Sequence, residues 1–321
     1  PKTMQGITTE ILGQDGFSMA PMYRKGGDKV WEDHLSGLNG RANKEWTWGS
    51  TSDYLNAIKN NGVAPNVGML VGHGTVRFNI MGMDDRQPNS KELDEMKELI
   101  LESLEQGALG FSTGLVYSPQ VNAGTEEVQE LAGCLSGYGR PFVAHIRNEH
   151  SNIWSALDEF IDVGSAEDIP LHLSHFKTAG SRQHGKSQRA IEIIESARER
   201  GVDITADQYP YTAGSTMLAS FLPSRVRSGS VESTINQLRQ SREEVVNYLH
   251  TETEPSWDEM VITSVQTETN NSYVGMSVTD IAADMDVTPP NAVIDLLINE
   301  KLEVEQYSYH SIEEDVTNIL E

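Results

Sequence analysis

The chain has very little cysteine and few basic residues. Its 321 residues include one cysteine, Cys134, which excludes an internal disulfide framework and any zinc site built from several cysteines. A metal site would therefore have to use histidines and carboxylates. The chain has 24 Lys and Arg against 48 Asp and Glu, a formal net charge of −24. This excess excludes a phosphate-binding surface as the main function, and we expect no nucleic-acid partner.

The chain also lacks long apolar runs. Its apolar stretches are far shorter than the roughly 20 residues needed to cross a bilayer, and no basic-then-apolar leader opens it. We therefore expect a soluble, cytoplasmic protein without a membrane partner. At this length one large α/β barrel is as plausible as two ordinary domains.

The acidity has two interpretations. It can be a solvated surface that keeps the protein in solution. Alternatively it reflects adaptation to high salt, because acidic residues are spread along the whole chain and only 10 lysines stand beside 14 arginines. In that case self-repulsion at low ionic strength is an expected cost.

Short apolar runs alternate with amphipathic stretches, a pattern typical of a mostly parallel sheet. Apolar residues recur at helical spacing after Asn89, after Thr125, after Ser151 and before Gly201, and we assign these stripes to the core. The expected strands are 7–12, 67–71, 109–113, 142–145, 171–175 and 202–206.

The strand ends follow a regular cadence. Ser112, His145, His175 and Asp207 are separated by 33, 30 and 32 residues, about one βα unit each. A doubly wound sheet would show the same spacing, but the chain has no Gly-rich dinucleotide fingerprint, so we predict an α/β fold of the TIM (β/α)8 type. We expect one barrel domain over 1–321, with about 216–300 as a helical insertion or lid, because the rhythm breaks after Ser215.

Two histidines stand where a barrel places its active site, at the carboxyl ends of strands. His145 and His175 each follow an apolar run and belong to adjacent strands about 4.8 Å apart, so both can reach one metal ion. His172 alternates with leucines and is predicted to point away. Three histidines are weaker candidates in loops: His73, His150 and His184. Three others are expected at the surface: His34, His250 and His310.

Six motifs carry a family resemblance. They are similar, in order, to the N-acyl-D-amino-acid deacylase (D-aminoacylase) family of the amidohydrolase superfamily, and they occupy residues 6–21, 72–77, 107–115, 145–149, 174–177 and 207–216. The resemblance implies an amidohydrolase TIM barrel, normally joined by a small β-sandwich made from the two chain ends. On this basis we expect an internal fragment, with the barrel incomplete at both ends and the sandwich segments absent.

The resemblance also implies a metal site. His145 and His175 are its expected ligands, together with Asp15, at a position where family members commonly have cysteine. A carboxylate is a harder donor than a thiolate, so we expect a divalent ion, zinc first, with manganese, cobalt or iron as alternatives. Without the resemblance, Asp15 before Gly16 would be read as an ordinary turn residue.

Substrate contacts are implied at Lys177, Tyr209 and Ser215, which match family positions that hold the carboxylate and acyl groups of the substrate. Lysine supplies a point charge and the hydroxyls supply oriented donors. Arg147 is a second cationic candidate, with Glu149 or Asp207 as alternative partners in an ion pair.

The implied reaction is metal-dependent hydrolysis of an N-acyl-D-amino acid to a carboxylate and a D-amino acid. No residue matches the family's first-strand His-x-His or its catalytic aspartate, which is expected beyond Glu321. We therefore assign no catalytic base, and we expect the 321 residues alone to be inactive. The alternatives are a cyclic-amide hydrolase related to dihydropyrimidinase or dihydroorotase, disfavoured because no lysine ends the strand at 109–113, and an inactive barrel that serves as a binding module.

Overall fold

The computed structural model describes residues 2–41, 45–227 and 229–321. Contacts divide the chain into two compact units. Unit 1 comprises Pro1–Asp28, Lys44–Phe176 and Arg189–Gln208, and unit 2 comprises Lys29–Asn43, Lys177–Gln188 and Tyr209–Glu321. None of the described helices is long and apolar enough to span a membrane.

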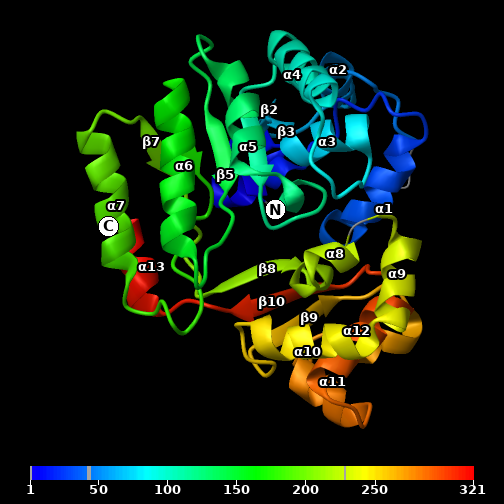
Figure 1. Cartoon of the computed structure of the whole chain (residues 1–321). Helices are drawn as coiled ribbons and strands as arrows, with labels where there is room; N and C mark the ends of the chain where they lie inside the picture. The colour runs from blue at the N-terminus through cyan, green and yellow to red at the C-terminus, as the bar shows by residue number, and fades with distance from the viewer. Residues whose placement is uncertain (1, 42–44, 228) are drawn as a thin grey trace. The chain divides into compact units, whose positions relative to one another are not determined.

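Unit 1 alternates strands with helices and short 3-10 turns, written η (Figure 1). Its strands are β1 (Thr9–Leu12), β2 (Asn66–Met69), β3 (Val71–Gly72), β4 (Phe111–Gly114), β5 (Phe142–His145), β6 (Leu171–Leu173) and β7 (Ile204–Ala206). Its helices are α2 (Thr51–Asn61), α3 (His73–Met81), α4 (Ser90–Glu105), α5 (Thr125–Ala132), α6 (Ile153–Glu167) and most of α7 (Ser187–Glu199). The 3-10 turns are η1 (Lys2–Gln5), η2 (Gln14–Gly16), η3 (Gln120–Asn122) and η4 (Gly133–Leu135).

Every strand of unit 1 runs parallel to its neighbours. The order β3-β4-β5-β6-β7 follows the chain, and β1 pairs with β2. Leu70 alone separates β2 from β3, and its N–H donates to the Leu12 carbonyl at 2.8 Å. A doubly wound sheet reverses its strand order at a switch point, whereas a barrel does not. The α/β class is thus confirmed and the winding is compatible with a TIM-type barrel, although the described strands do not form a closed one.

The helices of unit 1 form as their sequences predict. Asn89 caps α4 in a capping box with Glu92, while Met96, Ile100 and Leu104 of the same helix are buried. Successive helices from α3 to α6 pack on one another. Strands β4 and β5 are buried at every position, as expected for a parallel sheet covered by helices.

His73 was expected in a loop, but the structure places it in a helix. It is the first residue of α3 and is fully buried. Its ring nitrogens lie 3.0 Å from the hydroxyl of Thr113 and 3.0 Å from a carboxylate oxygen of Glu127. Arg77 contacts both oxygens of Glu127 at 2.6 Å, so this network ties α3 to β4 and α5.

Unit 2 contains an antiparallel sheet of order β8-β10-β9 and a set of helices. The strands are β8 (Ala213–Met217), β9 (Met260–Ser264) and β10 (Glu305–Tyr309). The helices are most of α1 (Gly27–Asn39), and α8 (Ser224–Arg227), α9 (Val231–Gln240), α10 (Arg242–Glu252), α11 (Val278–Asp284), α12 (Pro289–Asn299) and α13 (Glu313–Leu320), with 3-10 turns η5 (Leu218–Phe221) and η6 (Glu268–Tyr273).

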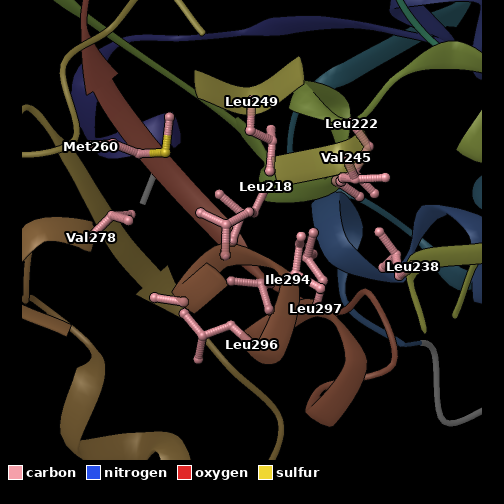
Figure 2. Close-up of a cluster of buried hydrophobic side chains, with 14 of the residues drawn as sticks. Leu218, Leu222, Leu238, Val245, Leu249, Met260, Val278, Ile294, Leu296 and Leu297 are labelled. Atoms are coloured by element: carbon pink, nitrogen blue, oxygen red, sulfur yellow. The ribbon is translucent and has the colours of Figure 1, made fainter. Parts of the chain in front are cut away.

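The core of unit 2 lies between this sheet and its helices. Figure 2 shows Leu218 and Leu249 directed toward one another, with Ile294 and Leu297 of α12 nearby. The region 216–300 is helical as expected, but it also supplies β9 to a sheet that the sequence did not predict. The assignment of this region as a lid within one barrel domain remains a prediction.

Candidate functional site

Three predicted ligands converge in unit 1. Asp15, His145 and His175 each offer one donor atom, and these atoms lie within 4.8 Å of one another. Nδ1 of His145 lies 2.9 Å from Nε2 of His175, and that Nε2 lies 3.6 Å from a carboxylate oxygen of Asp15. The two rings meet edge to face at 82°. One carboxylate oxygen and two imidazole nitrogens facing a common point suit a divalent transition metal ion.

The two histidines occupy neighbouring strand ends. His145 is the last residue of β5, and His175 follows the end of β6 by two residues. Its φ of 37° lies in the left-handed region, which non-glycine residues rarely adopt. The Asp207 carboxylate accepts a hydrogen bond of 2.6 Å from the His175 N–H and helps to hold this conformation. Backbone strain of this kind concentrates at functional sites.

Asp15 lies in the short turn η2, also with a left-handed φ, of 55°. Ser112 of β4 binds both ends of this turn, because its hydroxyl accepts a hydrogen bond from the Gly16 N–H at 3.1 Å and donates one to the Gly13 carbonyl. The Gln120 amide donates to the Asp15 carbonyl at 2.7 Å. Residues about 100 positions downstream therefore fix the orientation of Asp15.

The site favours a charged Asp15. Burial raises the pKa of this carboxyl, but the hydrogen bond to His175 and the nearby imidazoles outweigh it, so the pKa lies below its ordinary value. The pKa of Asp207 is lowered in the same way: burial raises it, but hydrogen bonds from His172 and from the His175 backbone lower it by more. Asp15 can therefore serve as an anionic ligand at neutral pH.

Glu149 is part of the site, although the sequence suggested it only as a partner for Arg147. One of its oxygens lies 3.0 Å from Nδ1 of His175 and the other lies 3.9 Å from Nε2 of His145. Its place four residues after His145, within the same motif, was the available signal.

Arg147 does not make either ion pair suggested for it. Its guanidinium contacts the Glu159 carboxylate of α6 at 2.8 and 2.9 Å instead. Burial raises the pKa of Glu159, but hydrogen bonds from Arg147 and Thr125 lower it below its ordinary value. Because Arg147 is engaged in this bidentate pair, its role in substrate binding remains a prediction.

His172 lies outside the three-residue group. Its Nδ1 lies 2.8 Å from the Thr205 hydroxyl and its Nε2 lies 2.9 Å from the Asp207 carboxylate. Since Asp207 also binds the backbone of His175, His172 of β6 supports the site through Asp207 without offering a ligand atom to it.

The other candidate residues belong to unit 2. The Lys177 ammonium lies 5.5 Å from the centre of the Tyr209 ring, and the side chain of Lys177 is largely buried. The hydroxyl of Ser215 donates to the Gln306 carbonyl at 3.1 Å across the sheet. The structure thus brings Lys177 and Tyr209 together, while Ser215 contacts β10.

His310 was expected at the surface, and this prediction is wrong. The residue is buried, its Nδ1 lies 3.1 Å from the Ser308 carbonyl and its Nε2 lies 3.2 Å from the Tyr209 hydroxyl. Gly214 makes room for this pair, because a β-carbon there would lie 2.8 Å from the Tyr209 oxygen and 2.6 Å from the His310 ring. His310 follows β10, a strand whose pairing the sequence did not reveal.

Comparisons with known proteins agree with this geometry. No family model matches the chain. Over 218 residues it is 35% identical to a D-aminoacylase from Alcaligenes xylosoxydans xylosoxydans, covering 68% of this chain and 44% of that protein. Among solved structures, it is similar to N-acyl-D-glutamate deacylase from Bordetella bronchiseptica complexed with zinc and a phosphonate inhibitor. The TM-score is 0.79 at 26% identity, and the match covers 99% of this chain and 58% of that chain.

A crystal structure of D-aminoacylase, described as defining a novel subset of amidohydrolases, matches with a TM-score of 0.76 and 28% identity over 100% of this chain and 58% of that one. The chain spans about half the length of the curated relatives and solved proteins that it matches. Sequence motifs, strand order and these likenesses together show that the chain belongs to the D-aminoacylase family of N-acyl-D-amino-acid deacylases, within the amidohydrolase superfamily.

Proposed function

We propose that the protein is a metal-dependent hydrolase that cleaves the amide bond of N-acyl-D-amino acids to give a carboxylate and a D-amino acid. The observation that carries the proposal is the convergence of Asp15, His145 and His175 beside parallel strand ends. The names of the relatives support the substrate class.

The donor set fits one divalent ion, held by Asp15, His145 and His175. Such an ion, when bound, would polarise the acyl carbonyl and lower the pKa of bound water toward about 7. The carboxylate at position 15 supplies the negative charge that a thiolate would otherwise bring, and its lowered pKa keeps that charge at neutral pH. Zinc is the first expectation, followed by manganese, cobalt and iron.

The substrate's own carboxylate requires a cation, and Lys177 is the residue proposed to supply it. Its stem is buried and its ammonium lies beside the Tyr209 ring, an arrangement that limits where the charge can point. The Tyr209 hydroxyl is oriented by His310, and Ser215 offers a second hydroxyl. With the carboxylate and the acyl group both fixed, the D side chain has one remaining direction, which disfavours the L enantiomer.

The decisive experiment assays the complete gene product, reconstituted with zinc or manganese, on N-acetyl-D- and N-acetyl-L-methionine. We expect turnover of the D substrate only. His145→Ala and His175→Ala should abolish tight metal binding and turnover, whereas His250→Ala, at an exposed position of α10, should change neither.

The alternatives give different outcomes in the same assay. Turnover of a dihydropyrimidine in place of the N-acyl-D-amino acid would assign a cyclic-amide hydrolase. Tight metal binding without turnover of either substrate would favour a binding module, and absence of metal binding would contradict the site itself.

A further inference from the structure

Glu149 lies in the loop after β5 and is almost completely buried, with 8% of its surface exposed. Each histidine ring has one nitrogen that faces the other histidine and one nitrogen on its outer edge. The Glu149 carboxylate lies beside these outer edges. One oxygen lies 3.0 Å from Nδ1 of His175, while Nε2 of that ring faces His145 and Asp15. The other oxygen lies 3.9 Å from Nε2 of His145, while its Nδ1 faces His175.

This arrangement has a consequence for proton placement. A neutral imidazole carries one N–H, and the nitrogen without it has the lone pair that can bind a metal ion. A carboxylate at hydrogen-bond distance from Nδ1 of His175 favours the N–H on that nitrogen. Nε2 then keeps the lone pair that can bind a metal ion. At His145 the second oxygen is beyond hydrogen-bond distance. The contact of 2.9 Å between Nδ1 of His145 and Nε2 of His175 places the proton on Nδ1 of His145 when Nε2 of His175 is the acceptor, so both neighbours of His175 favour the same tautomer of that ring.

We propose that Glu149 is a positioning residue, whose carboxylate selects the metal-binding tautomer of His175. The proposal rests on the metal site of the proposed function, and it is independent of the reaction and substrate assigned there. Glu149 acts through His175, because one of its oxygens contacts the outer edge of that ring and Glu149 is not a member of the three-residue donor group.

The burial of Glu149 strengthens this effect. Water competes little for a carboxylate with so little exposed surface, so its interaction with His175 is stronger than the same contact at the protein surface. An uncharged acceptor at this position would keep part of the hydrogen bond to His175 and lose the added strength that the negative charge gives it. A side chain without an acceptor would lose both.

Three substitutions separate these contributions. Glu149→Gln keeps an acceptor without charge, Glu149→Leu removes both, and Glu149→Asp keeps the charge on a shorter side chain. Glu98→Leu, at an exposed position of α4, is the matched control. We expect zinc affinity, measured by competition with a chromophoric chelator, to fall about 10–100-fold in Glu149→Leu, less in Glu149→Gln, and to be partly restored in Glu149→Asp.

The second readout is the tautomer itself. In the metal-free protein labelled with ¹⁵N-histidine, two-bond ¹H–¹⁵N spectra should show His175 protonated on Nδ1 in the wild type and in Glu98→Leu. The same proton should redistribute between the two nitrogens in Glu149→Leu. His175→Gln and His145→Gln assign the signals by their disappearance.

The outcomes are distinct. An unchanged His175 tautomer and unchanged zinc affinity in Glu149→Leu would overturn the proposal, as would a loss of affinity in every variant with the tautomer intact, which indicates a purely structural role. If Glu149→Leu does not fold, Glu149→Gln and Glu149→Asp carry the same test. Failure of the deacylase assignment would appear as absent turnover with these metal-free spectra unaffected.

Discussion

Gly114, the last residue of β4, lies so close to Asp15 that a β-carbon on it would stand 2.4 Å from the Asp15 carbonyl oxygen. That distance is far below any ordinary contact. The turn that contains Asp15 can pack against β4 only because residue 114 has no side chain. The position of one predicted ligand therefore depends on a glycine about 100 residues downstream.

Gly114→Ala should displace the Asp15 turn. We expect zinc affinity to fall more than about 10-fold and the free energy of unfolding to fall by about 1–3 kcal/mol, as for other overpacking changes. Chelator competition and urea unfolding measure the two effects. Gly49→Ala is the control, because its β-carbon would make only ordinary contacts, with the Tyr23 ring at 3.7 Å and the Met22 carbonyl oxygen at 3.8 Å. Unaltered zinc affinity in Gly114→Ala would show that this close approach does not place Asp15.

Asp15→Cys should shift metal preference toward zinc. A thiolate is a softer ligand than a carboxylate, so we expect the ratio of zinc to manganese affinity to rise about 10-fold or more. Burial raises the pKa of Cys134, the one natural cysteine, to about 11, which makes that thiol a poor competitor for the ion. Asp85→Cys, which adds a thiol at an exposed position, should leave the ratio unchanged. An equal ratio in Asp15→Cys and wild type would remove Asp15 from the ligand set.

Lys177→Met tests recognition of the substrate carboxylate. Loss of a desolvated charged contact of about 3 kcal/mol should lower kcat/KM for N-acetyl-D-methionine by roughly 100-fold in the complete gene product. Metal content, measured by atomic emission, should not change. Lys186→Met, at an exposed position nearby in the chain, is the control. Wild-type kcat/KM in Lys177→Met would exclude a role for Lys177 in substrate binding.

Glu300, the residue directly after α12, stabilises unit 2 by accepting hydrogen bonds from η6 and from the two residues before it. Its carboxylate accepts from the Gln266 and Thr267 N–H groups at 2.6 and 2.8 Å, and also from the side chains of Thr267 and Asn270. Glu300→Gln should lower the free energy of unfolding by about 2 kcal/mol, as expected for hydrogen bonds to a charged group. Glu252→Gln, an exposed residue at the end of α10, should have little effect.

The difference between wild type and Glu300→Gln should also depend on pH. Burial raises the pKa of Glu300, but the hydrogen bonds outweigh it and hold the folded-state pKa below the ordinary value of 4.5. Stabilisation is therefore complete above about pH 4.5 and is lost as the pH falls through the folded-state pKa. Urea unfolding of both proteins between neutral and acidic pH measures this. A difference that grows on acidification would contradict the assigned ionisation.

The net charge of −24 predicts that salt stabilises the protein. Screening shortens the reach of charge repulsion from about 10 Å at 0.1 M to about 3 Å at 1 M salt. The thermal midpoint should rise over this range in sodium chloride. A flat or falling midpoint would favour a simple solvated surface over adaptation to high salt.

The sequence predicted the elements whose signals are local. The strand 142–145 and the Asn89 cap agree with the structure, because hydrophobic runs and caps depend on adjacent residues. The pairing of His145 with His175 also followed from repeat spacing, since strand neighbours in this sheet are chain neighbours.

Contacts between distant segments could not be predicted. The support of Asp15 by Ser112 and Gln120, and the contact of Glu149 with both histidines, depend on how loops fold over strand ends. The burial of His310 was not predicted because it depends on the pairing of β8 with β10, two strands about 90 residues apart in the chain. Arg147 lies within reach of several acids along the chain, and only the placement of α6 selects Glu159.

The sequential strand order of unit 1 also bears on how the chain acquires its structure. Each strand of the run from β3 to β7 pairs with the one made just before it, at a separation of about one βα unit. Loop closure over such short distances costs little entropy, and domains fold progressively as they leave the ribosome. His145 and His175 therefore come together as soon as β6 docks on β5, so this pair can form on the nascent chain before unit 2 is synthesised in full.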